Sequence, residues 1–245
     1  WTCEWKEGSS QLSKCSLGLA TLARFAFFGG VLMVLRKLAG IFACTLLIGF
    51  ATFAMANVPD LQESTAAPAF NSGQVSMYNL PNGGGASFTQ ARYWDGVSST
   101  VVDATITLTV LDNLLNPIFL YPFEDMWLES RDGGMFICPG GTVADLATDI
   151  NGQTEWVVPL RAGGWSDDLL QVMINGAALT SSAGMSIAVN SPDLNGSGQV
   201  ELGDVVIFSA DLFGPYAYRS DFNFDTDVNL LDVTRISAAW GAACQ

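Results

Sequence analysis

Two twelve-residue segments near the C-terminal end of the chain constrain its fold and chemistry more than any other feature. The first spans residues 193–204 and the second, 28 residues further on, spans residues 221–232. Each has oxygen-bearing side chains at positions 1, 3 and 5 and an aspartate at position 12. A loop with this spacing, completed by the backbone carbonyl of position 7, supplies the oxygen ligands that Ca²⁺ requires. The pattern therefore predicts two calcium sites.

The predicted ligands repeat from one loop to the next. They are Asp193, Asn195, Ser197, Gln199 (through its carbonyl) and Asp204 in the first loop, and Asp221, Asn223, Asp225, Asp227 (through its carbonyl) and Asp232 in the second. The alternative is a pair of ordinary Asp/Asn-rich turns. Two such loops in register, each followed by an apolar helical pattern, favour calcium. Ser197 stands where an aspartate is usual and Thr226 where a turn glycine is usual, so we expect unequal affinities. We also expect Val200 and Val228 to form a short β-contact between the loops.

No helix is expected before either loop. Pro192 stops a helix from entering the first loop, and Gly214-Pro215 breaks the chain between the repeats. A loop followed by a helix, twice, resembles the type I dockerin module, an EF-hand-like calcium domain that binds cohesin domains. The resemblance covers residues 191–245 and implies a calcium-dependent fold. Positions 10 and 11 are Leu-Gly and Leu-Leu rather than the Ser-Thr of familiar dockerins, so the resemblance does not identify a standard cohesin as the partner.

The overall composition excludes several classes of function. The formal charge is −14 and the sequence contains no histidine, so histidine-dependent catalysis is excluded. A chain this acidic lacks the excess of positive charge that binding to nucleic acid or to an anionic membrane surface requires. The expected partners are cations and other proteins.

The first 56 residues are predicted to be absent from the mature protein. Residues 33–56 combine a start methionine, a basic pair, an apolar run and an Ala-Met-Ala ending, which together are typical of a secretory signal peptide. The alternative is a retained transmembrane helix. Residues 1–32 are expected to be mistranslated upstream sequence. We therefore expect a protein that is secreted, either extracellular or at the cell surface, with no membrane association once the signal is cleaved.

Cleavage after residue 56 would leave two of the five cysteines, Cys138 and Cys244. An oxidising exterior permits them to pair, but two buried thiols or intermolecular bonds are equally compatible with the sequence.

The middle of the chain is predicted to be β-structure. Residues 57–73 form an extended leader, and residues 74–190 contain short β-prone runs separated by turn signals. The runs that we expect to be strands are 75–80, 86–94, 104–110, 117–121, 125–129, 134–138, 154–160, 169–174 and 185–189.

Two sequence segments in this region resemble parts of bacterial immunoglobulin-like surface domains. They are residues 106–112 leading to Asn116-Pro117, and the turn at residues 148–153. The predicted fold is therefore mainly β with a small α part: an immunoglobulin-like β-sandwich followed by a dockerin-like module of two loop-helix calcium repeats.

We consider three functions on the basis of the sequence. The first is a secreted, non-catalytic calcium-binding surface or extracellular assembly protein that contacts itself or a cohesin-like partner, with strand donation by the leader as an extension. The second is a dockerin-bearing carbohydrate-binding component of a polysaccharide-degrading complex. Its aromatic candidates, which more often belong to a core, are Trp94, Trp127, Trp156 and Trp165. The third, an enzyme using Glu124-Asp125 or Asp167-Asp168, is disfavoured because adjacent acids on a strand point to opposite faces.

Overall fold

The computed structural model describes residues 58–245, which belong to one compact unit spanning Ala56–Gln245. This part of the chain is mainly β-structure with few helices. Its strands are β1 (Thr65–Pro68), β2 (Val75–Tyr78), β3 (Ala91–Trp94), β4 (Ser99–Val102), β5 (Ile106–Thr109), β6 (Met126–Ser130), β7 (Met135–Ile137), β8 (Gln153–Trp156), β9 (Ala162–Gly164), β10 (Leu170–Ile174), β11 (Ala177–Ala178) and β12 (Ile187–Asn190). Its helices are α2 (Leu202–Leu212), α3 (Leu230–Ala238) and the short 3₁₀ helices η1 (Phe88–Gln90), η2 (Phe123–Asp125) and η3 (Tyr218–Ser220).

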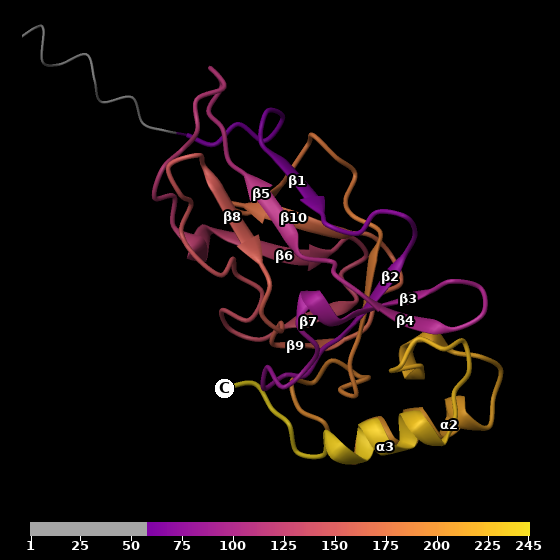
Figure 1. Cartoon of the computed structure of the whole chain (residues 1–245). Coiled ribbons are helices and arrows are strands. Elements are labelled where there is room, and N and C mark those ends of the chain that lie inside the picture. The colour runs from indigo at the N-terminus through magenta and orange to yellow at the C-terminus, as the bar shows by residue number, and fades with distance from the viewer. Residues whose placement is uncertain (1–57) are drawn as a thin grey trace, which may run out of the picture. The chain divides into compact units, whose positions relative to one another are not determined.

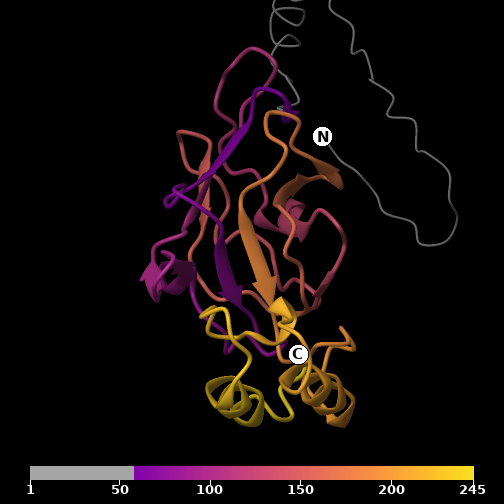
Figure 2. The same cartoon turned by 90° about the vertical axis from the view of Figure 1, so that its right-hand side faces the viewer.

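The strands form four small sheets. Two have three strands, in the orders β1-β5-β8 and β11-β10-β6; one has four, β12-β2-β3-β4; and β7 pairs with β9. Within these sheets only β12 and β2 run parallel. Figure 2 shows these two strands side by side, pointing toward the helices. The four-stranded sheet therefore leads directly to the C-terminal segment.

The main core is built from the inward residues of several sheets. In β5, Ile106 and Leu108 are fully buried whereas Thr107 is exposed, and the strand predicted within residues 104–110 is confirmed. The same alternation buries Leu128 of β6 and Trp156 of β8 in one apolar cluster. Residues with period-two patterning thus pack on a common interior.

Some strand predictions were wrong. Residues 117–121 form no strand, and Pro117 makes a single bridge to Leu111. Within the predicted leader, Thr65–Pro68 forms β1 and pairs with β5 of the same chain. Strands β4, β9 and β11 were not predicted; β9 and β11 are short and contain no β-branched residue, whereas β4 is rich in β-branched residues and was missed.

The predictions for residues 1–32 and 33–56 lie outside the described residues. Among residues 58–245, no helix has both the length and the apolar character needed to cross a bilayer.

A second apolar cluster lies under α2 and α3, at the end of the molecule where Figure 1 shows both helices. It includes Leu194, Val200, Phe208, Phe222 and Ile236 from the C-terminal segment. Leu80, which follows β2, also belongs to it. Cys138 and Cys244, whose pairing the sequence left open, form a disulfide. The C-terminal segment thus shares both core and covalent contacts with the sheets.

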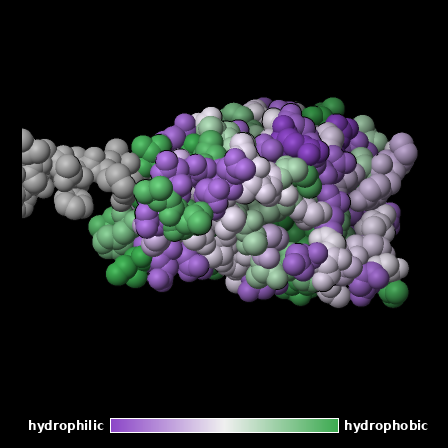
Figure 3. All heavy atoms as spheres, turned by 90° about the horizontal axis from the view of Figure 1, so that it is seen from above, coloured by the Kyte–Doolittle hydropathy of each residue, from purple (hydrophilic) through white to green (hydrophobic). Residues whose placement is uncertain are grey.

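The surface shown in Figure 3 mixes hydrophilic and hydrophobic side chains, with hydrophobic ones gathered near the end where the described chain begins. The loop between β5 and η2 carries four exposed apolar side chains: Leu114, Leu115, Phe119 and Leu120.

Candidate metal centre

The first predicted loop folds around two buried aspartates. Asp193 and Asp204 are both fully buried. The Oδ1 and Oδ2 atoms of Asp193 accept hydrogen bonds from the backbone N–H groups of Ser197 and Gly198, at 2.9 and 2.8 Å. Those of Asp204 accept from Asn195 and Glu201, at 3.0 and 2.8 Å. The first and last positions of the loop are thereby brought to its interior.

The second loop repeats this arrangement, except that its position-12 aspartate accepts from position 2 rather than from position 3. Asp221 and Asp232 are fully buried. Asp221 accepts from the backbone N–H groups of Asp225 and Thr226, which again are positions 5 and 6. Asp232 accepts from Phe222 and Asn229 at 2.8 and 3.0 Å. The sequence repeat is therefore also a structural repeat.

The position-12 aspartates also cap the two predicted helices. Asp204 and Asp232 are the third residues of α2 and α3, and each accepts a hydrogen bond from the backbone of the residue preceding its helix. A carboxylate there satisfies a free N–H group and interacts favourably with the positive end of the helix. One residue thus both closes the loop and caps the N-terminal end of the helix.

Burial of these carboxylates costs free energy when they are charged. Burial raises the pKa of Asp193 and of Asp232 above the ordinary value, and raises the pKa of Asp221 to about 6, even though each accepts backbone hydrogen bonds. The neighbouring carboxylates Asp204 and Asp232 add repulsion at Asp193 and Asp221, respectively. A cation in either loop would offset both effects.

The remaining donors suit a hard cation. Asn223, at position 3 of the second loop, donates its amide to Asp225 at 2.8 Å, while its buried Oδ1 atom has no hydrogen-bond partner. A carboxylate oxygen that accepts one N–H retains a lone pair for a metal. Ca²⁺ accepts amide, hydroxyl and carbonyl oxygens besides carboxylates. The donor set therefore fits calcium, although residues 58–245 contain no group of three or more His, Cys, Asp or Glu side chains placed to hold a metal ion.

The two loops differ in charge. The first places two aspartates among its predicted ligands, whereas the second has three aspartate side chains, Asp221, Asp225 and Asp232. Asp227 and Gln199 stand at position 7 with exposed side chains, which is compatible with a ligand role for the carbonyl alone. If both loops were to hold Ca²⁺, the greater ligand charge would favour tighter binding in the second loop.

The predicted contact between Val200 and Val228 is wrong. Val200 instead pairs with the C-terminal end of the chain: its N–H donates to Ala242 at 2.8 Å, and its carbonyl accepts from Gly241 at 3.1 Å. Val228 packs against the second apolar cluster without pairing to Val200. The C-terminal residues had no strand pattern, so the sequence offered no signal for this pairing.

Both loops contact the sheets. Gly163 of β9 lies so close to the Asp193 carboxylate that a Cβ atom there would overlap it, and the N–H of Gly164 donates to the Asp193 carbonyl at 2.7 Å. Asn190 of β12 donates to the Asp221 carbonyl at 2.6 Å, and Ser99 of β4 donates to the Asn223 carbonyl at 2.7 Å. The sheets thereby hold the first residue of each loop in place.

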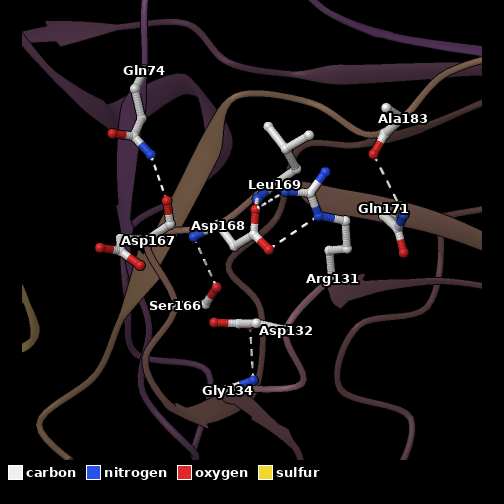
Figure 4. Close-up of polar contacts among 10 residues, drawn as sticks. All are labelled: Gln74, Arg131, Asp132, Gly134, Ser166, Asp167, Asp168, Leu169, Gln171 and Ala183. Carbon is white, nitrogen blue, oxygen red and sulfur yellow. Dashed lines mark hydrogen bonds and ion pairs between the residues drawn. The ribbon is translucent and has the colours of Figure 1, made fainter.

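The acid pairs considered for catalysis have other contacts. The Arg131 Nε atom donates to Asp168 at 3.0 Å, and the Asp167 carbonyl accepts from Gln74 at 2.8 Å (Figure 4). The ion pair lowers the pKa of Asp168. Glu124 and Asp125 belong to the short helix η2.

The four tryptophans differ in exposure. Trp156 is fully buried and donates to the Thr142 carbonyl at 3.0 Å, so it belongs to the core. Trp94, Trp127 and Trp165 are half-buried, and Trp127 donates to Glu129 at 2.7 Å.

Comparison with known proteins yields one distant likeness. No protein-family model matches the chain, and no curated protein matches its sequence. Among solved structures, a crystal structure of the Lin-41 filamin domain is 13% identical over 53% of this chain and 95% of that chain, with a TM-score of 0.26. A likeness this slight does not define the fold family.

Proposed function

We propose that this chain is a secreted, non-catalytic protein that binds Ca²⁺ in its two C-terminal loops and acts through contacts with other proteins. In this proposal, residues 74–190 form an immunoglobulin-like β-sandwich and residues 191–245 a dockerin-like module. The ions are structural: they hold the loops and the sheets together rather than switching between states.

The observation that carries the proposal is the repeated cluster of buried carboxylates. Four aspartates, Asp193, Asp204, Asp221 and Asp232, are fully buried without a basic side chain bonded to any of them. Buried carboxylates without a counter-charge are costly, and their pairwise repulsion adds to that cost. Bound Ca²⁺ would offset the free-energy cost of burying these carboxylates, and the free Oδ1 atom of Asn223 would coordinate it.

Calcium titration of the purified chain tests this proposal. We expect two binding events by calorimetry and a rise in thermal midpoint at calcium concentrations well above the dissociation constants. Asp221→Asn removes a buried ligand charge and should weaken one event at least about tenfold. The matched control, Asp227→Asn, changes an exposed side chain in the same loop and keeps the backbone carbonyl, so its affinity should stay within about twofold of the wild type.

Absence of both heat and stabilisation at about 10 mM CaCl₂ would overturn the calcium proposal, because extracellular sites of this type bind in the millimolar range or tighter. Equal losses in the two variants would show that general acidity, rather than the buried ligand set, attracts the ion.

Exposed apolar side chains on the two helices support action through protein contacts. Leu202 of α2 and Leu230 of α3 occupy equivalent positions in the repeats and are 67% and 75% exposed. Leu231 of α3 and Val206 of α2 are also exposed, at 57% and 64%. Size measurement by light scattering with Ca²⁺ should show self-association if a second copy is the partner, and Leu202→Glu with Leu230→Glu should abolish it.

Strand donation by the leader is a less favoured route to assembly. β1 already pairs with β5 through four residue pairs in its own chain, so donation to another molecule would first have to release it.

A further inference from the structure

A groove of about 700 Å³ lies between the β3–β4 hairpin and the segment formed by the second loop and α3. Figure 1 shows this hairpin beside the C-terminal segment, and the Ser99–Asn223 hydrogen bond joins the two. The side chains that matter for its chemistry are Arg92, Trp94, Ser99, Asp225, Thr234 and Arg235. A second hollow of about 340 Å³ also has Arg92 and Arg235 in its wall. The two arginines therefore border both hollows.

These arginines are unusual among the cations of the described chain. Arg131 pairs with Asp168, Arg219 pairs with Asp211, and Arg161 donates to two backbone carbonyls. By contrast, within residues 58–245 the guanidinium groups of Arg92 and Arg235 make no ion pair or hydrogen bond. Arg235 lies over the ring of Tyr78, 5.1 Å from its centroid.

The charge of the groove opposes that of the chain. The whole sequence has 24 acidic residues against ten basic ones, yet this groove combines two arginines with one aspartate, Asp225. A guanidinium group binds a carboxylate in a planar, bidentate manner. An anionic ligand would thus find here donors that no neighbouring side chain already uses.

The other residues that line the groove indicate which kind of molecule bears the anionic group. Trp94 is half-buried and lies in the wall. The hydroxyl groups of Ser99 and Thr234 donate to the carbonyls of Asn223 and Leu231, so toward a ligand their oxygen atoms act as acceptors. An indole offers a large, rigid apolar face with a polar edge. Sugar rings combine apolar C–H faces with hydroxyl groups, and a groove of this volume accommodates one or two of them.

We propose that this groove binds a carboxylated sugar, the uronic acid unit of an acidic polysaccharide. The carboxylate pairs with Arg92 and Arg235, and the ring lies against Trp94. The carboxylates of an acidic peptide would pair with Arg92 and Arg235, but such a peptide would offer no sugar ring to contact Trp94. Two residues of the wall, Asn223 and Asp225, are predicted calcium ligands, but the side chains proposed to contact the sugar, Arg92, Arg235 and Trp94, lie outside that set.

The test is a titration of the purified chain with digalacturonate, with the neutral disaccharide galactobiose as the matched ligand. Calcium is held constant throughout so that the state of the loops does not vary. We expect digalacturonate to bind with a dissociation constant on the order of 1 mM and to quench tryptophan fluorescence, and galactobiose to bind at least about tenfold more weakly.

Variants locate the site. Arg92→Gln, Arg235→Gln and Trp94→Ala should each weaken digalacturonate at least about tenfold, and Arg92→Lys should lose less than Arg92→Gln because it keeps the charge. Arg161→Gln and Trp240→Ala change an arginine and an exposed tryptophan outside the groove and should leave binding unchanged. Unchanged thermal midpoints in the groove variants establish that they fold.

Four results would overturn the proposal: no binding of digalacturonate at about 20 mM, equal affinity for both disaccharides, full affinity in both arginine variants, or tighter binding of tetraglutamate than of digalacturonate. The last result would identify an acidic peptide as the ligand.

Discussion

At the scale of single residues, position 6 of each loop has the same backbone conformation but a different side chain. Gly198 in the first loop has φ 85° and Thr226 in the second has φ 69°. Position 4 shows the same contrast, with Gly196 at φ 65° and Phe224 at φ 53°. Left-handed backbone is unstrained for glycine and costly for a β-branched residue. The second loop therefore stores strain that the first loop avoids.

Exchange of these residues should move stability in opposite directions. We expect Thr226→Gly to raise the free energy of unfolding by about 1 kcal/mol, because it relieves backbone strain. Gly198→Thr should lower it by about 2 kcal/mol or more, since the new Cβ would also lie 3.0 Å from the Phe136 ring. Urea denaturation of each variant measures both changes.

The control is Thr107→Gly, at an exposed position of β5 with ordinary strand geometry. Removal of a strand side chain there should destabilise by about 0.5–1 kcal/mol. A Thr226→Gly variant that is destabilised as much as this control would contradict the strain argument.

At the scale of elements, one ion pair joins the two repeats. Asp211 near the end of α2 accepts from Arg219 in η3 at 2.7 and 2.8 Å, and from Ser220 at 2.6 Å. Burial raises the pKa of Asp211, but these hydrogen bonds outweigh it and hold the pKa below its ordinary value of 3.8. The pair sets the position of the segment that enters the second loop.

The lowered pKa makes a prediction about acid stability. Because Asp211 binds protons less readily in the folded state than in the unfolded state, its contribution is fully present above pH 3.8 and is lost as the pH falls through the folded-state pKa. Asp211→Asn should therefore lower the free energy of unfolding by about 1–2 kcal/mol at pH 7. The difference from wild type should shrink below about pH 4.

Chemical denaturation at a series of pH values measures this difference. Asp227→Asn, which changes an exposed carboxylate, serves as the control and should show no such trend. A gap between Asp211→Asn and wild type that stays constant down to pH 2 would show that the carboxylate acts through packing rather than charge.

The elements also show which predictions a sequence can support. The helices after the two loops were predicted, since the loop spacing and the apolar pattern that follows are local signals. β5 was predicted because its threonines alternate with larger apolar residues. β9, by contrast, reads Ala-Gly-Gly, and its glycines are required because the Asp193 carboxylate and the Gly134 carbonyl approach them closely. That requirement comes from residues about 30 positions away in either direction, and no local pattern records it.

The candidate loops follow the same rule. The aspartates at positions 1 and 12 were found from spacing alone, and the structure brings them to the interior of each loop. The pairing of Val200 with Ala242 and the groove formed by Arg92 and Arg235 join residues 42 or more positions apart, so they depend on the folded chain. Each site is therefore predictable to the extent that its members are close in sequence.

At the scale of the whole molecule, the C-terminal end braces the first loop. The backbone N–H of Cys244 donates to the Gly198 carbonyl at 2.9 Å, beside the Val200–Ala242 pairing. The disulfide between Cys244 and Cys138 closes a segment of 106 residues and links this C-terminal segment covalently to the region just after β7. Closure of so long a segment restricts the unfolded chain strongly.

Removal of the disulfide should therefore affect both stability and one calcium loop. We expect the Cys138→Ala/Cys244→Ala variant to lose about 3–5 kcal/mol of unfolding free energy. Its first loop should bind Ca²⁺ more weakly, because Gly198 and Val200 lose a fixed partner, whereas the second loop has no direct bond to the C-terminal residues. Calorimetry on this variant with and without Asp221→Asn separates the two loops, and urea denaturation measures the stability. Equal weakening of both loops would mean that the disulfide acts on the module as a whole; unchanged affinity in the first loop would mean that the brace holds without a covalent tie.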